Sequence, residues 1–222
     1  MVGHFQEFED EYLEMMYEFH ESDAGGVVRT GALASKLGVS PASATEMVQR
    51  LSTRGYLEYI PYKGARLTSK GLVHGQKMKR RHRLAEVLLD LLPYDGNPHE
   101  TACRLEHAID DDMEVALSRL ITPETLDPSG REIPQPTADI ADRLSSSNQT
   151  CSLEGLADGA AGRLSMLLLH AAEVAAMNQQ GFAVGANITR ESDSYILENG
   201  AVAQLSDDTK RSIFVEIETK SV

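Results

Sequence analysis

The sequence is poor in cysteine and in long apolar stretches, and both scarcities exclude classes of protein. Its 222 residues include only two cysteines, Cys103 and Cys151, too few for a disulfide-rich domain. No apolar run approaches the roughly 20 residues that cross a bilayer, and the N-terminus lacks a basic segment followed by an apolar one. We therefore expect a cytoplasmic protein in a reducing compartment, with no membrane partner.

Basic residues are also scarce, but they are clustered. The formal net charge is -13, and residues 1–28 hold eight acids and no Lys or Arg. In contrast, residues 50–83 hold ten Lys or Arg and one acid, Glu58, a balance of +9. Residues 84–222 return to 24 acids against nine bases. A charge run is usually a solvated face, but this segregation favours one surface that binds nucleic acid on an otherwise acidic molecule.

The basic segment overlaps a helix-turn-helix pattern. Residues 29–37 have apolar side chains at helical spacing, and Gly38 is a typical helix stop. Ser40 and Pro41 then form an N-cap and first turn, and a second helix ends before Gly55. Its buried stripe is predicted to be Ala44, Met47, Val48 and Leu51.

Two short strands, 56–60 and 65–68, follow around Lys63 and Gly64 and predict a β-hairpin wing. The whole segment is thus a winged helix-turn-helix. Such a module can also dock proteins, but the local charge favours DNA. The candidate DNA-binding residues are Ser40, Pro41, Ala42, Ser43, Thr45, Gln49, Arg50, Lys63 and Arg66.

Possible metal ligands occur on both sides of this motif. On a helix, Cys103, Glu106 and His107 share one face, and a thiolate, a carboxylate and an imidazole suit a borderline transition metal. The alternative is a buried cysteine beside a solvated Glu–His pair. Other helical pairs are Glu11 with Glu14 in a helix over 7–20, and His82 with Glu86 in a helix over 77–92. His99 lies four residues before Cys103, so His99, Cys103 and His107 are predicted to line one stripe of a third helix.

The order of these parts resembles the diphtheria toxin repressor family of metal-activated transcriptional repressors, which has iron-dependent and manganese-dependent branches. The resemblance covers at least residues 8–120. The segments that carry it are Glu11-Tyr12-Leu13, Ser40-Pro41, Leu67-Thr68-Ser69-Lys70-Gly71, Arg81-His82-Arg83-Leu84-Ala85-Glu86, and His99-Glu100-Thr101-Ala102-Cys103-Arg104-Leu105-Glu106-His107.

The resemblance implies two metal positions. The activating position would use Glu11, Cys103, Glu106 and His107, and the ancillary position His82, Glu86 and His99. Glu11 departs from the family, since iron-type members have methionine there and manganese-type members aspartate. Cys103 matches the iron branch, whereas Glu14 matches a further manganese-type ligand. A glutamate that reaches the ancillary metal in relatives corresponds to Glu173, but Ala176 stands where its partner glutamine would be.

The predicted fold is mainly α with small β parts. It consists of a winged-helix DNA-binding domain (1–73), a helical metal-binding and dimerisation domain with linker (74–150), and an SH3-like β-barrel of the FeoA type (151–222). The first assignment follows from the residues, and the resemblance implies the others. Short glycine-punctuated segments after residue 152 and an Asn199-Gly200 turn support the β domain.

These observations predict a homodimeric repressor that binds a palindromic double-stranded DNA operator with Fe(II) as corepressor, and that controls iron uptake. The thiolate of Cys103 favours Fe(II), while the additional carboxylates leave Mn(II) and manganese transport as the alternative. Zn(II) and Co(II) are also expected to bind in vitro. A metal-independent regulator with Cys103 as a redox switch is a second alternative. An enzyme is not expected, because no oxyanion-stabilising loop accompanies Cys103 and His107.

Overall fold

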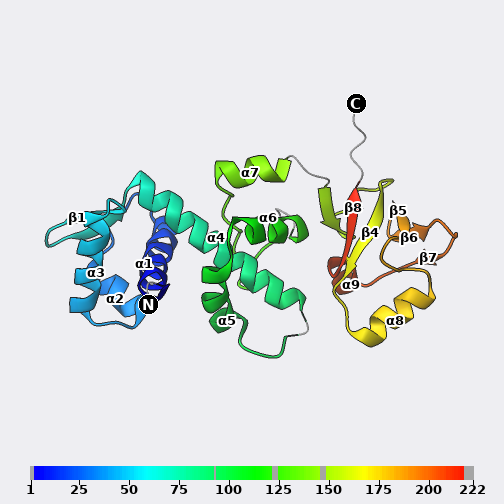
Figure 1. Ribbon diagram of the computed structural model, residues 1–222, viewed down its shortest axis with the longest axis horizontal. Helices are drawn as coiled ribbons and strands as arrows, with labels where there is room; N and C mark the ends of the chain where they lie inside the picture. Colours follow the sequence, from blue (N-terminus) through cyan, green and yellow to red (C-terminus); the bar gives the residue numbers. More distant parts are fainter. Residues whose placement is uncertain (1–2, 93, 122–124, 146–148, 218–222) are drawn as a thin grey trace. The chain divides into compact units, whose positions relative to one another are not determined.

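The computed structural model describes residues 3–92, 94–121, 125–145 and 149–217 (Figure 1). The chain divides into two compact units. The first comprises residues 1–83, 104–108 and 133–137, and the second comprises 84–103, 109–132 and 138–222. Among the described helices, none is both long and apolar enough to cross a membrane.

The first unit contains the predicted winged helix-turn-helix. Its elements are α1 (Gly3–Ser22), α2 (Thr30–Leu37), α3 (Pro41–Thr53), β1 (Leu57–Ile60), β2 (Gly64–Leu67), most of α4 (Ser69–Leu91) and the 3₁₀ turn η1 (Glu106–Ala108). Gly38 ends α2 with a positive φ of 65°, and the Ser40 hydroxyl accepts the Ser43 N–H at 3.0 Å to cap α3. Both features confirm the predicted helix boundaries.

The core of this unit joins α1 to helices α2 and α3 and to the wing. Ala44, Val48 and Leu51 are buried as predicted, whereas Met47 is half-buried. They pack with residues of α1, α2 and the wing, namely Tyr12, Leu13, Met16, Leu33, Ala34, Leu57 and Ala65. Strands β1 and β2 pair antiparallel from Leu57 opposite Leu67 to Ile60 opposite Gly64, which confirms the hairpin.

Helix α4 begins eight residues earlier than the predicted start at Lys77. Gly71 and Gly75 weaken the helical pattern in the sequence, yet both lie inside α4. At each of them, the backbone of a residue outside α4 passes too close for a side chain. A Cβ atom would lie 2.0 Å from the Tyr56 carbonyl oxygen at Gly71 and 2.4 Å from that of Leu13 at Gly75. These glycines therefore allow close packing and do not break the helix.

The second unit contains the remaining helices and a β domain. Its helices are the last turns of α4, α5 (Pro98–Leu105), α6 (Asp111–Leu120), α7 (Ala138–Ser145), α8 (Ala171–Gln179) and α9 (Asp207–Arg211). Its strands are β3 (Gln149–Ser152), β4 (Ala161–Leu167), β5 (Asn187–Glu191), β6 (Ser194–Leu197), β7 (Val202–Ala203) and β8 (Ile213–Ile217). Helix α7 lies in the region that the sequence indicated only as an extension and linker.

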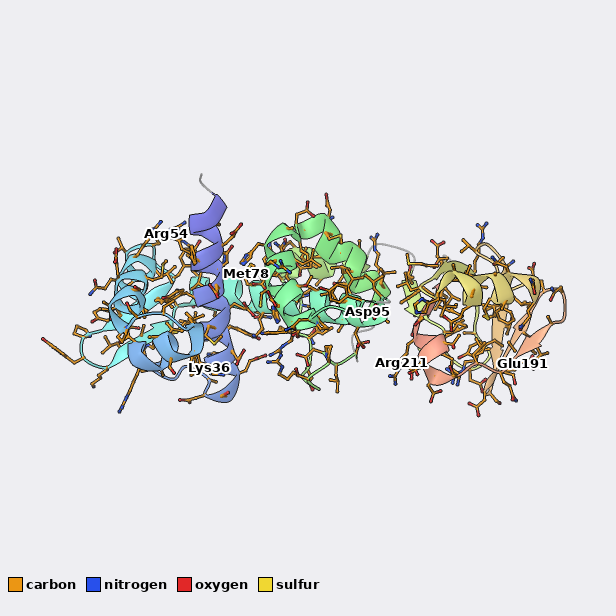
Figure 2. The ribbon with its side chains drawn as sticks, turned by 90° about the horizontal axis from the view of Figure 1, so that it is seen from below. Lys36, Arg54, Met78, Asp95, Glu191 and Arg211 are labelled. Atoms are coloured by element: carbon orange, nitrogen blue, oxygen red, sulfur yellow. The ribbon has the colours of Figure 1, made fainter. Side chains whose placement is uncertain are left out.

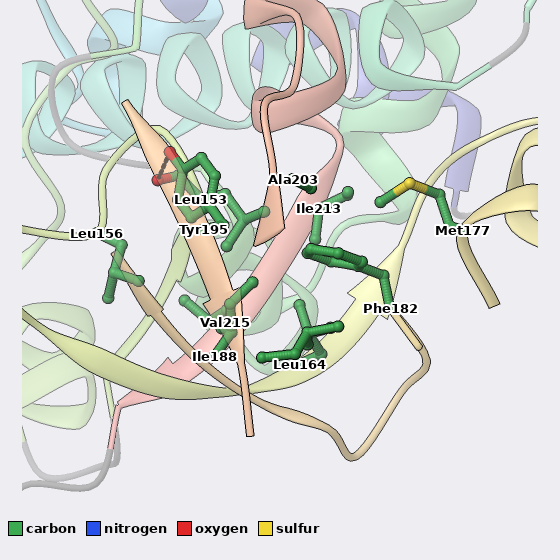
Figure 3. Close-up of a cluster of buried hydrophobic side chains, with 11 residues drawn as sticks. Leu153, Leu156, Leu164, Met177, Phe182, Ile188, Tyr195, Ala203, Ile213 and Val215 are labelled. Atoms are coloured by element: carbon green, nitrogen blue, oxygen red, sulfur yellow. Dashed lines mark hydrogen bonds between the residues drawn. The ribbon is translucent and has the colours of Figure 1, made fainter. Parts of the chain in front are cut away.

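The six strands form one antiparallel sheet in the order β3-β8-β4-β5-β6-β7, which confirms a small C-terminal β domain. Its core includes Phe182, Ile188, Ile213 and Val215 (Figure 3). The buried Tyr195 hydroxyl donates to the Leu153 carbonyl at 2.8 Å and so satisfies its polar end. The three-domain boundaries themselves remain a prediction.

Candidate metal centre and DNA-binding surface

Three possible metal ligands meet in the interior of the first unit. Glu14 from α1, His82 from α4 and Glu106 from η1 each offer an atom, and these atoms lie within 4.8 Å of one another. His82 Nδ1 is 2.6 Å from Glu106 Oε2 and 3.7 Å from Glu14 Oε1. All three residues are buried. The sequence placed His82 and Glu106 at different metal positions, but here their side chains share a hydrogen bond.

The environment of Glu106 favours its protonated form. Burial raises the pKa of Glu106 to about 7, and the charge of Glu14 adds to this, while the hydrogen bond with His82 opposes it. A proton is therefore readily held within the Glu106–His82 pair near neutral pH. A divalent cation would replace that proton, because metal coordination requires the carboxylate.

Lys79 approaches the same cluster from α4. Its ammonium nitrogen lies 3.0 Å from Glu14 Oε1 and 2.7 Å from Glu18 Oε2. Burial alone would lower the pKa of Lys79, but the two glutamates outweigh burial and raise it. At Glu18, burial acts to raise the pKa, but the hydrogen bond and charge of Lys79 hold it at about 2. Lys79 and Glu18 are therefore charged at neutral pH.

Asp10 is a buried carboxylate that the sequence analysis missed. Its Oδ1 lies 2.6 Å from His74 Nε2, and its Oδ2 lies 3.8 Å from His107 Nδ1. Burial would raise the pKa of Asp10, but hydrogen bonding to His107 and His74 lowers it to about 2. The spacing of four residues between Asp10 and Glu14 could have indicated that both lie on one face of α1.

Two other predicted ligands lie near this cluster in the first unit. His107 is half-buried, and its Nε2 lies 3.5 Å from Glu106 Oε1. The Glu11 residue is largely exposed, although partial burial of its carboxyl group and the charge of Glu14 raise its pKa, with His107 opposing them.

Three further predicted ligands form contacts in the second unit. His99 Nδ1 lies 2.8 Å from Glu86 Oε1, and His99 Nε2 lies 4.0 Å from Cys103 Sγ. Arg131 Nη2 is 3.7 Å from the other oxygen of Glu86. His99 is mostly exposed and Cys103 is half-buried. These residues could form part of a second metal position.

The prediction that one α-helix carries Cys103, Glu106 and His107 is wrong. Helix α5 ends at Leu105, and residues 106–108 form a 3₁₀ turn, so the spacing of an α-helix does not continue through them. His107 therefore lies outside the α-helix that holds His99 and Cys103. The 3₁₀ turn coincides with a tertiary interaction, since buried Glu106 shares a hydrogen bond with His82 of α4, which is distant in the sequence.

Glu173 has a structural role in the β domain. It lies in the first turn of α8, where its Oε2 accepts the His170 N–H at 3.1 Å. This bond is half of a capping box and stabilises the start of the helix. The predicted approach of Glu173 to a metal remains a prediction.

The candidate DNA-binding residues form two groups. Pro41, Ala42 and Gln49 are exposed on α3, and Lys63 is exposed at the tip of the wing. The others also have structural partners. Ser40 caps α3 by accepting the Ser43 N–H, and the Thr45 hydroxyl donates to the Pro41 carbonyl at 2.8 Å. Arg50 pairs with Glu9 at 2.9 Å, and Arg66 pairs with Glu58 at 2.8 Å. DNA-phosphate contacts by Arg50 and Arg66 would compete with these ion pairs.

The first unit combines a winged helix-turn-helix with an interior cluster of possible metal ligands. That combination is typical of metal-responsive transcriptional regulators. Comparison with known proteins specifies the family. Residues 4–65 match the iron dependent repressor N-terminal DNA binding domain, and residues 68–135 match the iron dependent repressor metal binding and dimerisation domain. The chain therefore belongs to the iron-dependent, or diphtheria toxin, repressor family.

Curated relatives agree with this assignment. An uncharacterised helix-turn-helix regulator of Methanocaldococcus jannaschii is 36% identical over 106 residues, 47% of this chain and 84% of that protein. The regulator MntR of Oceanobacillus iheyensis is 38% identical over 44% of this chain and 66% of its own length. The diphtheria toxin repressor of Corynebacterium efficiens is 29% identical over 92% of this chain and 93% of its own length. The crystal structure of T. acidophilum IdeR covers 95% of this chain and 97% of its own, at 20% identity and a TM-score of 0.48.

The family consists of metal-dependent, DNA-binding transcriptional repressors and not of enzymes. This chain contains both its DNA-binding domain and its metal-binding and dimerisation domain. The predicted class of function, a metal-dependent transcriptional repressor, is thereby confirmed.

Proposed function

We propose that this protein is an Fe(II)-activated repressor that acts in the cytoplasm as a homodimer on a palindromic operator and controls iron uptake. The observation that carries the metal dependence is the interior cluster of Glu14, His82 and Glu106. Two carboxylates and one imidazole are a suitable donor set for Fe(II) or Mn(II), and a thiolate ligand from Cys103 would favour Fe(II) over Mn(II).

The residues assigned to metal binding act from both sides of the DNA-reading helices in the sequence. Glu11 and Glu14 precede α2 and α3, whereas Glu106 and His107 follow them. A bound divalent cation supplies positive charge that these side chains share. Their convergence fixes α1 and η1 relative to each other, which narrows the conformations of the DNA-binding unit and raises its affinity for an operator of fixed half-site spacing.

The ancillary position is proposed to use His82, Glu86 and His99, with Glu173 as an additional ligand. The contact of His99 with Glu86 and with Cys103 supports a metal-binding role for this group in the second unit. In the present side-chain arrangement, His82 bonds to Glu106 and Glu173 caps α8. Both would have to change partners on metal binding.

The substitution Glu106→Ala tests this function. We expect it to weaken metal-stimulated operator binding by at least about tenfold. Loss of a residue that only hydrogen-bonds a metal ligand typically lowers metal affinity about 10–100-fold, and loss of a ligand should cost at least as much. The measurement is anaerobic fluorescence anisotropy with a labelled palindromic operator at fixed salt, with Fe(II) titrated into chelator-stripped protein. Glu100→Ala is the matched control, because Glu100 is exposed on α5. Unchanged metal dependence in Glu106→Ala would refute the assignment.

Mn(II) is the second candidate corepressor. It is favoured by Glu14, which adds a hard carboxylate to the cluster and matches a manganese-type ligand. Separate titrations with Fe(II) and Mn(II) distinguish the two, because the physiological corepressor should activate operator binding at the lower free concentration. A response to oxidants with no response to chelators would instead support Cys103 as a redox switch.

A further inference from the structure

Lys79 is a buried cation that contacts the metal-donor cluster. Its side chain is only 3% exposed, and its ammonium nitrogen lies 3.0 Å from Glu14 Oε1. That same oxygen is 3.7 Å from His82 Nδ1, within the group of three possible ligands. The second partner of Lys79 is Glu18, one helical turn further along α1, at 2.7 Å.

This position separates Lys79 from the surface cations of the basic segment. Sequence alone counts it among the ten Lys and Arg of residues 50–83, the segment predicted to provide the surface that binds nucleic acid. In the structure it is directed inward, against two carboxylates of α1. A buried ammonium group is stable only when it is paired, and Glu14 and Glu18 supply that pairing.

A lysine ammonium group and a divalent cation compete for the same carboxylate. The ammonium group has three donors and no lone pair, so it cannot itself coordinate a metal. It also repels a second cation, and this repulsion is stronger in a poorly solvated interior than in water. Every arrangement in which Glu14 binds metal therefore requires Glu14 to leave Lys79, or places two cations beside one carboxylate.

We propose that Lys79 is an internal competitor of the corepressor metal, which holds Glu14 and selectively weakens the carboxylate-rich coordination that Mn(II) prefers. Lys79 thus determines specificity without touching the metal. Fe(II) depends less on hard carboxylate ligands than Mn(II) does, so the weakening of Glu14 as a ligand biases binding toward Fe(II). This inference rests on the proposed metal-dependent function and names a determinant of its selectivity.

The test measures Mn(II) binding directly and does not use DNA. Chelator-stripped full-length protein is titrated with Mn(II), and the free ion is quantified by electron paramagnetic resonance. Lys79→Met and Lys79→Gln remove the charge, one with an apolar and one with a polar side chain of similar length. Lys36, which Figure 2 labels, is the matched control as Lys36→Met. Its side chain is exposed and pairs with Glu18 at 3.4 Å.

We expect both Lys79 variants to bind Mn(II) at least tenfold more tightly than the wild type. The ratio of Fe(II) affinity to Mn(II) affinity should fall by a similar factor. Lys36→Met should leave Mn(II) affinity unchanged. Adding Glu14→Gln to Lys79→Met should remove the gain, because the released carboxylate is then absent. A weaker or unchanged Mn(II) affinity in a Lys79 variant of native helix content would overturn the proposal.

The wild-type titrations separate this proposal from the function on which it rests. A wild type that binds neither Fe(II) nor Mn(II) would refute the proposed function. In that case, tight Mn(II) binding by the Lys79 variants would still support competition by Lys79. Failure of those variants to bind would overturn both proposals. If the wild type binds metal and the Lys79 variants have the same Mn(II) affinity as the wild type, only the proposed role of Lys79 is overturned.

Discussion

At the scale of single residues, the ionisable side chains of the candidate metal centre already pair with one another. Lys79 forms ion pairs with Glu14 and Glu18, and His82 shares a hydrogen bond with Glu106. These pairings agree with the rule that buried ionisable groups need partners. A divalent cation must therefore displace existing interactions, and the displaced groups determine its apparent affinity.

The raised pKa of Glu106 predicts that metal binding releases a proton. With a folded-state pKa of about 7, above the ordinary value of 4.5, Glu106 is mostly protonated at pH 6 and mostly ionised at pH 8. Metal affinity should rise through this window by up to about tenfold per pH unit, because the metal requires the carboxylate. Isothermal titration calorimetry at pH 6 in buffers of different ionisation enthalpy measures the released proton.

The raised pKa of Glu106 also affects folding stability. Without metal, stability is expected to fall as the pH rises, whereas metal affinity is expected to increase. The stability that protonated Glu106 contributes is fully present below pH 4.5 and is lost as the pH rises through about 7. Glu106→Gln, which stays neutral, should reduce both the proton release and this loss of stability. Proton release that persists unchanged in Glu106→Gln would assign the proton to another group.

At the scale of elements, local signals in the sequence predict structure well where the stabilising interactions are local. Ser40 and Pro41 start α3, Gly38 ends α2, and the hairpin pairs as expected, because capping and turn geometry depend on adjacent residues. The start of α4 was missed because Gly71 and Gly75 pack against Tyr56 and Leu13, which are distant in sequence.

The candidate site follows the same division. The residue types and their presence on α1, α4 and the segment 99–107 could be predicted, because helical spacing is local. The end of α5 at Leu105, the pairing of His82 with Glu106 and the inward direction of Lys79 could not. Each depends on contact between segments that are far apart in the chain, for which a single sequence carries no direct signal.

The wing provides a prediction about an element. Gly64 has a φ of 136°, and an added Cβ would lie 2.0 Å from the Val28 carbonyl oxygen. Gly64→Ala should therefore lower the free energy of unfolding of the DNA-binding unit by about 1–3 kcal/mol and distort the wing. Urea denaturation measures the change. Gly31→Ala in α2 is the control, since nothing lies within 4 Å of its added Cβ, and it should be neutral or slightly stabilising. Equal effects of the two substitutions would show that the close approach to Val28 is unimportant.

At the scale of the whole molecule, charge is divided between segments of opposite sign. The chain has a net charge of -13, yet residues 50–83 carry ten basic residues and one acid. An acidic molecule repels DNA at a distance, so we expect DNA binding to depend on local phosphate contacts from the basic segment. Several of these cations have intramolecular partners, as Arg50 has in Glu9 and Arg66 has in Glu58. Lys63, exposed at the wing tip, is thus the clearest candidate for a phosphate contact.

Lys63→Ala should weaken operator binding without changing sequence preference. If Lys63 neutralises one phosphate in each protomer, the slope of log affinity against log salt should become less negative by about 0.9 per lysine. Anisotropy titrations across a salt series, with saturating Fe(II), measure the slope for the operator and for an unrelated duplex. Lys210→Ala in the β domain, where Lys210 pairs with Asp207 at 3.0 Å, is the charge-matched control and should leave the slope unchanged. An equal change in slope for both variants would mean that net charge, and not a wing contact, governs the salt dependence.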